Sequence, residues 1–255
     1  MPHTDTGSGT HATGLDADPR PAPGPEDTLE LRIPAGFPGR PAPAAAPGSY
    51  GPGDPAGRLL ARLAEADLLD SPAEWGPVST PAGPFRLVPV RPEQDLDLIA
   101  RWMNDPVTAA FWELAGPPEV TMAHLRAQLD GDGRSIPCLG LLDGTPMSYW
   151  EVYRADLDPI ARHYPARPHD TGLHLLIGEA ADRGRGIGTQ LLRAVSDLVL
   201  DHRPRCARVV AEPALANTPS VAAFLGSGFR YCAELDLPGK RAALMIRERA
   251  LRTLL

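Results

Sequence analysis

A glycine-rich loop in the second half of the chain has the composition of an anion-binding site. Residues 183–188 read Arg-Gly-Arg-Gly-Ile-Gly, after the short apolar run 173–178 and before a helical pattern from Thr189 to Leu200. Glycines leave backbone N–H groups uncovered, and the N-terminus of a helix attracts negative charge. The sequence therefore predicts that a phosphate or pyrophosphate binds at this loop.

The position of the loop distinguishes it from other glycine-rich phosphate loops. A dinucleotide-binding loop lies in the first strand–helix–strand unit with an acidic residue after the next strand, and a P-loop ends in Gly-Lys-Ser or Gly-Lys-Thr. Here the loop comes late, begins with Arg183 and lacks that lysine. Neither of these nucleotide-binding classes fits the sequence.

The elements that must position the loop follow from hydrophobic periodicity. The apolar run 173–178 has the pattern of a buried strand, and Asp143-Gly144 is a hairpin turn. We expect further strands at 85–90, 136–142, 147–154, 206–212, 229–236 and 241–247, and helices at 92–103, 120–129 (capped by Thr121), 189–200 and 218–226. These elements predict an α/β fold with one mixed sheet covered by helices.

The N-terminal part of the chain differs in composition from the rest. Residues 1–57 are rich in Pro, Gly and Ala, and of the 30 prolines of the chain 12 lie before residue 56. Such a segment buries too little apolar surface to offset the entropy of ordering, so we expect a disordered arm. Residues 58–82 predict a short amphipathic helix and a linker, and the predicted strands and helices place the main folded domain at residues 83–255.

Charge and cysteine content exclude several classes of protein. The formal net charge is −7 without a Lys/Arg run, which argues against a nucleic-acid or anionic-membrane partner. Cys138, Cys206 and Cys232 have neither disulfide nor metal-ligand spacing, and the 7 histidines suggest no metal site. Without a signal peptide or an apolar span, the sequence predicts a cytoplasmic protein.

The order of elements around the loop resembles the acyl-CoA-binding core of GNAT N-acetyltransferases. In this core, Arg-x-x-Gly-x-Gly follows a strand, and a helix, a strand and Asn217 at the start of another helix come next. The resemblance implies that acyl-CoA is the co-substrate and that Asn217 reaches its pantetheine arm, although Asn217 could equally be a helix cap. It also implies that the thioester carbonyl and pyrophosphate are held by Ile177, Arg183, Gly184, Arg185, Gly186, Ile187 and Gly188.

A narrower resemblance extends from residue 86 to about residue 249. Its motifs are Trp-Met-Asn-Asp-Pro-Val at 102–107, Phe-Trp-Glu at 111–113, Tyr-Trp-Glu-Val-Tyr-Arg at 149–154, the segment 170–178 and Glu-Pro at 212–213. In this order they resemble the siderophore-biosynthetic N-acyltransferases, the group of the aerobactin N-hydroxylysine acetyltransferase and the mycobactin lysine N-acyltransferase. The expected fold is then the GNAT fold.

That family resemblance implies a catalytic pair of His174 and Asp236. Acyl transfer from a thioester requires an unprotonated nitrogen, so a group must take up its proton. Histidine side chains ordinarily titrate near neutrality, so His174 would suit this task, and Asp236 could orient it or act as the base. The alternatives are a hydrogen-bonded core histidine and an aspartate at a strand end.

The same resemblance implies residues for the acceptor. Trp112, Trp150 and Glu151 would lie beside the acceptor groove, and Glu151 and Asp170 would be counter-charges for an amine, with His174 also facing the acceptor. Each has a simpler interpretation, because aromatic residues commonly fill cores and carboxylates are commonly solvated.

The sequence thus predicts an enzyme that moves an acyl group from acyl-CoA, or an acyl carrier protein, to the side-chain amine or N-hydroxyamine of lysine, ornithine or cadaverine. An amide or hydroxamate for iron chelation would result. Two alternatives remain: an aminoglycoside 6'-type N-acetyltransferase, and a non-catalytic regulatory module that binds acyl-CoA.

Overall fold

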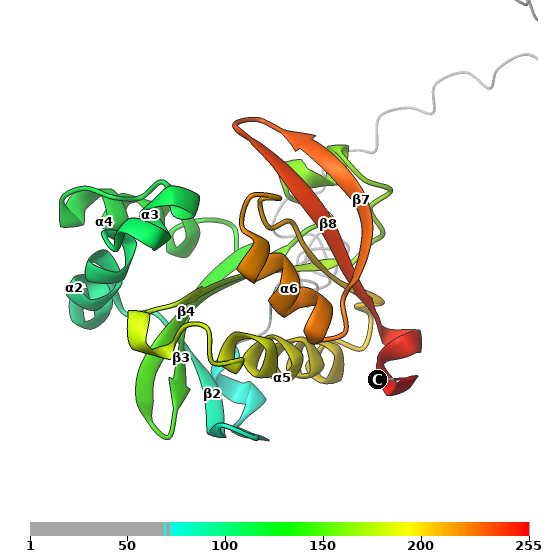
Figure 1. Ribbon diagram of the computed structural model, residues 1–255, viewed down its shortest axis with the longest axis horizontal. Coiled ribbons are helices and arrows are strands. Elements are labelled where there is room, and N and C mark those ends of the chain that lie inside the picture. Colours follow the sequence, from blue (N-terminus) through cyan, green and yellow to red (C-terminus); the bar gives the residue numbers. More distant parts are fainter. Residues whose placement is uncertain (1–68, 70–71, 255) are drawn as a thin grey trace, which may run out of the picture. The chain divides into compact units, whose positions relative to one another are not determined.

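The computed structural model describes Leu69 and residues 72–254 of the chain. In this part, an eight-stranded sheet has the strand order β1-β2-β3-β4-β5-β6-β8-β7. Neighbouring strands are antiparallel except for β5 and β6, which are parallel. The mixed sheet flanked by helices is the α/β fold that the sequence predicts (Figure 1).

The strands lie close to where hydrophobic periodicity places them. They are β1 (Val78–Thr80), β2 (Gly83–Pro89), β3 (Ser135–Leu142), β4 (Thr145–Arg154), β5 (Thr171–Ile177), β6 (Arg208–Ala211), β7 (Arg230–Leu237) and β8 (Lys240–Glu248). Asp143 and Gly144 have φ values of 49° and 79°, both in the left-handed region that a tight hairpin turn requires. The predicted turn between β3 and β4 is therefore confirmed.

The helices include one that the sequence analysis missed. They are α2 (Pro92–Met103), α3 (Pro106–Trp112), α4 (Pro118–Leu129), α5 (Ile187–His202) and α6 (Thr218–Gly226), with 3-10 turns η1 (Pro72–Trp75), η2 (Pro159–Arg162), η3 (Ala180–Asp182) and η4 (Arg249–Leu254). Helix α3 was not expected, and it begins where the Asp105 side chain accepts the backbone N–H groups of Val107 and Thr108. Thr121 does not cap α4: Pro117 precedes that helix, and Thr121 is buried inside it.

Helices cover both faces of the sheet. Alternate residues of β4 point to opposite faces of the sheet. Trp150 and Val152 pack with α5 and α6, whereas Tyr149 packs with α2 and α4. Figure 1 shows α2, α3 and α4 grouped together, away from α5 and α6. The segment around η2 packs against β6 and β8, where Ile160 and Tyr164 belong to the same apolar cluster as side chains of these two strands.

The N-terminal boundary of the domain lies earlier than expected. Strand β1 pairs with β2, and Leu69 and Trp75 are buried in the same apolar cluster as α5. From residue 72 onward, the structure therefore shows a 3-10 turn and a paired strand where we expected a linker up to residue 82. The predicted arm at 1–57 and, except for Leu69, the amphipathic helix lie outside the described residues. Within residues 72–254, none of the helices is long and apolar enough to cross a membrane.

Candidate active site

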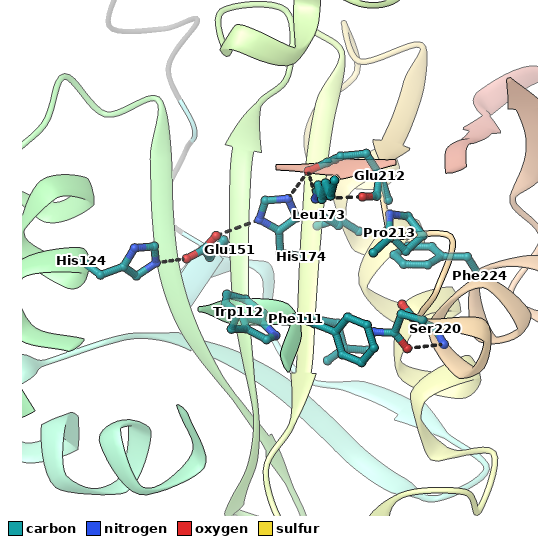
Figure 2. Close-up of a pocket in the computed structure, with 15 residues that line it drawn as sticks. Phe111, Trp112, His124, Glu151, Leu173, His174, Glu212, Pro213, Ser220 and Phe224 are labelled. Atoms are coloured by element: carbon teal, nitrogen blue, oxygen red, sulfur yellow. Dashed lines mark hydrogen bonds and ion pairs between the residues drawn. The ribbon is translucent and has the colours of Figure 1, made fainter. Parts of the chain in front are cut away.

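A pocket opens where two central strands separate. The parallel strands β5 and β6 pair only at Thr171 with Val209 and at Gly172 with Val210. Beyond these pairs, a pocket of about 250 Å³ lies between β5 and the segment that follows β6, and α6 contributes to its wall (Figure 2). Its lining includes Leu173, His174 and Leu175 on one side and Ala211, Glu212 and Pro213 on the other.

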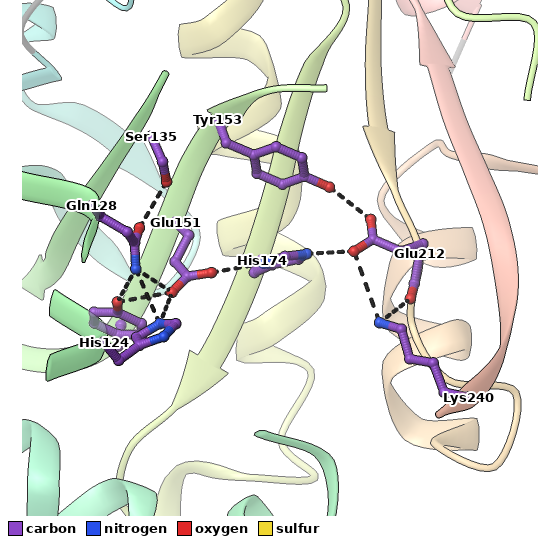
Figure 3. A network of polar contacts seen from close by, with 9 residues as sticks. His124, Gln128, Ser135, Glu151, Tyr153, His174, Glu212 and Lys240 are labelled. Atoms are coloured by element: carbon purple, nitrogen blue, oxygen red, sulfur yellow. Dashed lines mark hydrogen bonds and ion pairs between the residues drawn. The ribbon is translucent and has the colours of Figure 1, made fainter. Parts of the chain in front are cut away.

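His174 forms the centre of a polar network in this pocket. Its Nδ1 lies 2.8 Å from Oε2 of Glu151, and its Nε2 lies 2.5 Å from Oε1 of Glu212. An ionised carboxylate only accepts hydrogen bonds, so both ring nitrogens must donate and the ring is an imidazolium. Figure 3 shows the three side chains in one line, with the histidine in the middle.

The charges of Glu151, His174 and Glu212 stabilise one another. Burial alone would lower the pKa of His174, but the charge of Glu212 and the hydrogen bonds to Glu151 and Glu212 raise it to about 10. Burial would raise the pKa of Glu212, but His174 and, more weakly, Lys240 hold it at about 2. At neutral pH the three side chains carry one positive and two negative charges.

Sheet register explains why Glu151 meets His174. The two residues are direct partners in the β4–β5 ladder. Tyr149, Glu151 and Tyr153 alternate along β4 and therefore point to the same face. The Tyr149 hydroxyl donates to Glu151 at 3.0 Å, and the Tyr153 hydroxyl donates to Glu212 at 2.7 Å.

Helix α4 and the start of β8 complete the network. His124 Nε2 lies 2.5 Å from Glu151 Oε1, and Gln128, one helical turn later, donates to the same oxygen at 2.8 Å. On the other side, Lys240 Nζ donates to the Glu212 backbone carbonyl at 3.0 Å. Sequence reasoning missed these residues, although the i, i+4 spacing of His124 and Gln128 was a visible signal.

The structure does not bring Asp236 to His174. Asp236 lies on β7, exposed, opposite Arg241 of β8. In the strand order, β6 and β8 stand between β7 and β5. Three interstrand steps of about 4.8 Å each separate the strands. The carboxylates that contact His174 are Glu151 and Glu212, and the expected pairing with Asp236 is corrected accordingly.

Three of the expected acceptor residues, Trp112, Glu151 and His174, lie in the pocket, and two do not. Trp112 lines the pocket beside Glu151, and its ring meets His174 edge to face at 6.1 Å. Trp150 is fully buried on the opposite face of β4 and donates to Ser148. Asp170 is fully buried as well, and Arg208 donates to both of its oxygens. Trp150 and Asp170 therefore serve the structure of the core.

The glycine loop has the geometry of an anion site. Gly184 and Gly186 have φ values of 72° and 76°, and a Cβ built on either residue would meet no atom within 4 Å. Gly186 is the N-cap of α5 and offers no side-chain cap, so the first N–H groups of the helix, from Ile187 onward, have no side-chain partner from the cap residue. Gly188 follows in the first turn, beside the side chains of Leu175 and Ile177.

The two arginines of the loop have different surroundings. Arg183 turns inward, where it donates to the carbonyl oxygens of Ile177 and Gly178 and to the carboxylate of Asp105. It therefore ties the loop to α3. Arg185 is exposed and pairs with Asp182 at 3.5 Å.

Asn217 has a role at the start of α6. It caps the helix by accepting the backbone N–H of Ser220 at 3.2 Å. It also lines the pocket together with Ser220 and Phe224. The cap interpretation is thus correct, and the side chain still faces the space beside Glu212 and Lys240.

Comparison with known proteins identifies the class to which this fold and pocket belong. The model of the acetyltransferase (GNAT) domain family matches residues 91–237. The chain therefore belongs to the GNAT acetyltransferase family, and it is an enzyme that transfers acyl groups. The predicted fold and class of enzyme are confirmed.

The names of similar curated proteins describe acyltransferases that act on lysine or on a lysine derivative. Lysine N-acyltransferase MbtK of Mycobacterium sp. (strain MCS) is 35% identical over 203 residues, which cover 74% of this chain and 83% of that protein. The N(6)-hydroxylysine O-acetyltransferase of Escherichia coli is 39% identical over 158 residues, or 62% of this chain and 50% of that protein. The resemblance to this acyltransferase group is confirmed.

Solved structures share the fold. An uncharacterized protein from Bacillus halodurans is 31% identical with a TM-score of 0.66, covering 72% of this chain and 95% of that one. The aminoglycoside acetyltransferase AAC(6')-Ib, solved with acetyl-CoA, is 24% identical with a TM-score of 0.58, covering 65% of this chain and 94% of that one. At that identity, the second likeness shows the fold alone.

Proposed function

We propose that the enzyme transfers an acyl group from acyl-CoA to the side-chain amine or N-hydroxyamine of a lysine-type acceptor. The line Glu151–His174–Glu212 in the pocket between β5 and β6 carries this proposal. The named activities of the similar proteins from Mycobacterium and Escherichia coli support the choice of acceptor. Ornithine and cadaverine derivatives are the nearest chemical variants.

The acyl-CoA donor would fit the gap between β5 and β6. The pyrophosphate of coenzyme A would meet the N–H groups at the start of α5, beside Gly186. The pantetheine arm would run between β5 and Asn217 and bring the thioester to His174. A carrier-protein thioester presents the same arm and is the alternative donor. Because acyl-CoA is made in the cytoplasm, we propose that the enzyme works there.

The reaction needs one proton to move from nitrogen to sulfur. The acceptor nitrogen forms a bond to the thioester carbon, the C–S bond breaks, and the nitrogen loses a proton that the leaving thiolate gains. In the proposed step, Nε2 of His174 exchanges its hydrogen bond to Glu212 for one to sulfur and gives this proton to the leaving thiolate, and the Glu212 carboxylate so released accepts the proton from nitrogen. The protonated Glu212 then returns a proton to Nε2 of His174 through the hydrogen bond that the two side chains share.

The product would be an amide from an amine acceptor or a hydroxamate from an N-hydroxyamine acceptor. Hydroxamate oxygens are hard donors that suit ferric iron. We therefore propose a role in hydroxamate siderophore biosynthesis and iron acquisition, in which the enzyme itself needs no bound metal.

A thiol-release assay tests the proposed function. Acetyl-, succinyl- and long-chain acyl-CoA are each combined with lysine, N6-hydroxylysine, the matching ornithine and cadaverine compounds, and kanamycin. We expect turnover on lysine-type acceptors that is lost in His174→Ala and Glu212→Gln. Turnover on kanamycin alone would assign the enzyme to aminoglycosides instead. Tight CoA binding without any thiol release, also with a carrier-protein donor, would favour a regulatory module.

A further inference from the structure

A second cavity lies on the other side of His174. It has a volume of about 370 Å³ and shares His124, Glu151 and His174 with the first pocket. Its other walls come from α4, the start of β3, and the segment 157–159. Figure 3 shows Gln128 and Ser135 on one side of His174, and Glu212 and Lys240 on the opposite side. The donor arm and the acceptor can therefore approach the same histidine from two directions.

The second cavity contains a carboxylate without a cationic partner in the described part of the chain. Glu151 has His124 and His174, Glu212 has His174 and Lys240, and Asp156 has Arg154. By contrast, Asp158 Oδ1 accepts only the backbone N–H of Ile160, at 3.0 Å, and Oδ2 makes no hydrogen bond or ion pair within residues 72–254.

The electrostatic surroundings of Asp158 favour a bound cation. Burial raises the pKa of its carboxyl and the charges of Glu212 and Glu151 raise it further, whereas the Ile160 N–H and the charge of His174 lower it only in part. Because the net shift is upward, the positive charge near this partly buried carboxylate does not fully compensate it. An ammonium group that enters the cavity would supply this charge.

The rim of the same cavity offers a cation. Arg134, just before β3, donates through Nη1 to the carbonyl of Leu157 at 3.3 Å and pairs through Nε with the exposed Asp132 at 2.6 Å. Its Nη2 donates no hydrogen bond within residues 72–254, and the side chain is 53% exposed. The guanidinium is thus fixed beside the 157–159 segment and keeps donors for an anion.

We propose that this cavity binds the head group of a free α-amino acid acceptor, with Asp158 on the α-ammonium, Arg134 on the α-carboxylate, and the side-chain nitrogen at His174. The inference rests on the proposed function and narrows its acceptor. A diamine such as cadaverine lacks the carboxylate, and an amino acid within a peptide lacks both head-group charges. Both should be poor acceptors.

Acceptor analogues that each lack one charge test this assignment. N6-hydroxylysine is compared with its methyl ester, its α-N-acetyl derivative and N-hydroxycadaverine, and the lysine series is run in parallel. Asp158→Asn keeps the cap on η2 but loses the charge, and Arg134→Gln loses the cation. The matched controls are Asp130→Asn and Arg126→Gln, exposed residues at the end of α4.

We expect each charge change to act on the matching substrate group. Asp158→Asn should raise KM for the free amino acid by about tenfold or more, the size of one charge-assisted hydrogen bond, and should leave KM for the α-N-acetyl compound unchanged. Arg134→Gln should behave likewise toward the methyl ester. In both variants kcat and KM for acyl-CoA should stay near the wild-type values.

Three results would overturn the assignment. If the wild type accepts N-hydroxycadaverine as well as N6-hydroxylysine, the cavity does not read the head group, although the proposed function stands. Equal loss on all analogues in Asp158→Asn would assign a purely structural role to Asp158. If none of the amine acceptors supports thiol release, the proposed function itself fails, and this inference fails with it.

Discussion

Nε2 of His174 and Oε1 of Glu212 lie 2.5 Å apart and join two strands at the point where the strands separate. His174 is two residues past the last parallel pair on β5, and Glu212 immediately follows β6. The ion pair therefore bridges the split in the sheet. In the proposed function, the group that handles the proton and the pocket for the thioester then have the same structural origin.

Neutralising Glu212 should stop the chemistry and not the binding. In Glu212→Gln, the amide cannot take a proton, so we expect kcat to fall by about 10²- to 10⁴-fold. Asp236→Asn should retain wild-type kcat, because its carboxylate is exposed on β7, away from the pocket. Steady-state kinetics measure both variants. A collapse of kcat in Asp236→Asn with normal activity in Glu212→Gln would reverse the assignment.

The charge on His174 should make the fold sensitive to alkaline pH. The pKa of His174 is raised from 6.5 to about 10, so its ion pairs contribute fully below pH 6.5 and are lost as pH rises through about 10. We expect the Tm of the wild type to fall between about pH 7 and pH 9.5. In His174→Gln, Tm should be lower at pH 7 and change less over this range. Parallel curves for both proteins would argue against an imidazolium.

Gly186 separates the effect of backbone conformation from that of ligand binding. Its φ of 76° disfavours a side chain, so Gly186→Ala should lower the free energy of unfolding by about 1 to 2 kcal/mol. Gly186→Asn should cost less, because asparagine tolerates this conformation. Calorimetry should find weaker CoA binding in both variants, since either side chain enters the open space at the start of α5. Unchanged Kd in both would place the phosphates elsewhere.

The buried pair of Asp170 and Arg208 should matter for stability. Removing one member of a buried ion pair leaves the other uncompensated, and Asp170→Ala should lower the free energy of unfolding by about 3 to 5 kcal/mol. Glu234→Ala, which breaks an exposed pair with Arg241, should cost less than about 1 kcal/mol. Urea denaturation measures both. If Asp170→Ala instead raised KM for the acceptor in a fully stable protein, Asp170 would be a substrate residue after all.

Most elements of the fold could be predicted because their apolar residues follow a clear period. Helices α2 and α6 lie where periodicity places them, and the β3–β4 turn follows from Asp143-Gly144 alone. Helix α3 could not be seen in this way, because it has seven residues and only Thr108 among them is buried. Its signals were local: the cap Asp105 and the proline that follows it.

The site could be predicted only in part, because sequence does not give the lateral order of strands. His174 and Glu151 were found through motifs, but both Asp236 and Glu212 lie late in the chain, and only the order β5-β6-β8-β7 decides which meets His174. Strand alternation could have excluded one residue in advance. Trp150 and Glu151 are neighbours on β4, so both cannot face one groove.

The early end of the β5–β6 pairing leaves the rest of β5 without a strand partner on that side within the described residues. Past Gly172, the edge of β5 that would continue the ladder faces the pocket. An extended amide-containing chain laid along that edge would act as a temporary extra strand. The bound substrate would then form part of the sheet during catalysis, and that part of the sheet would be lost when the products leave.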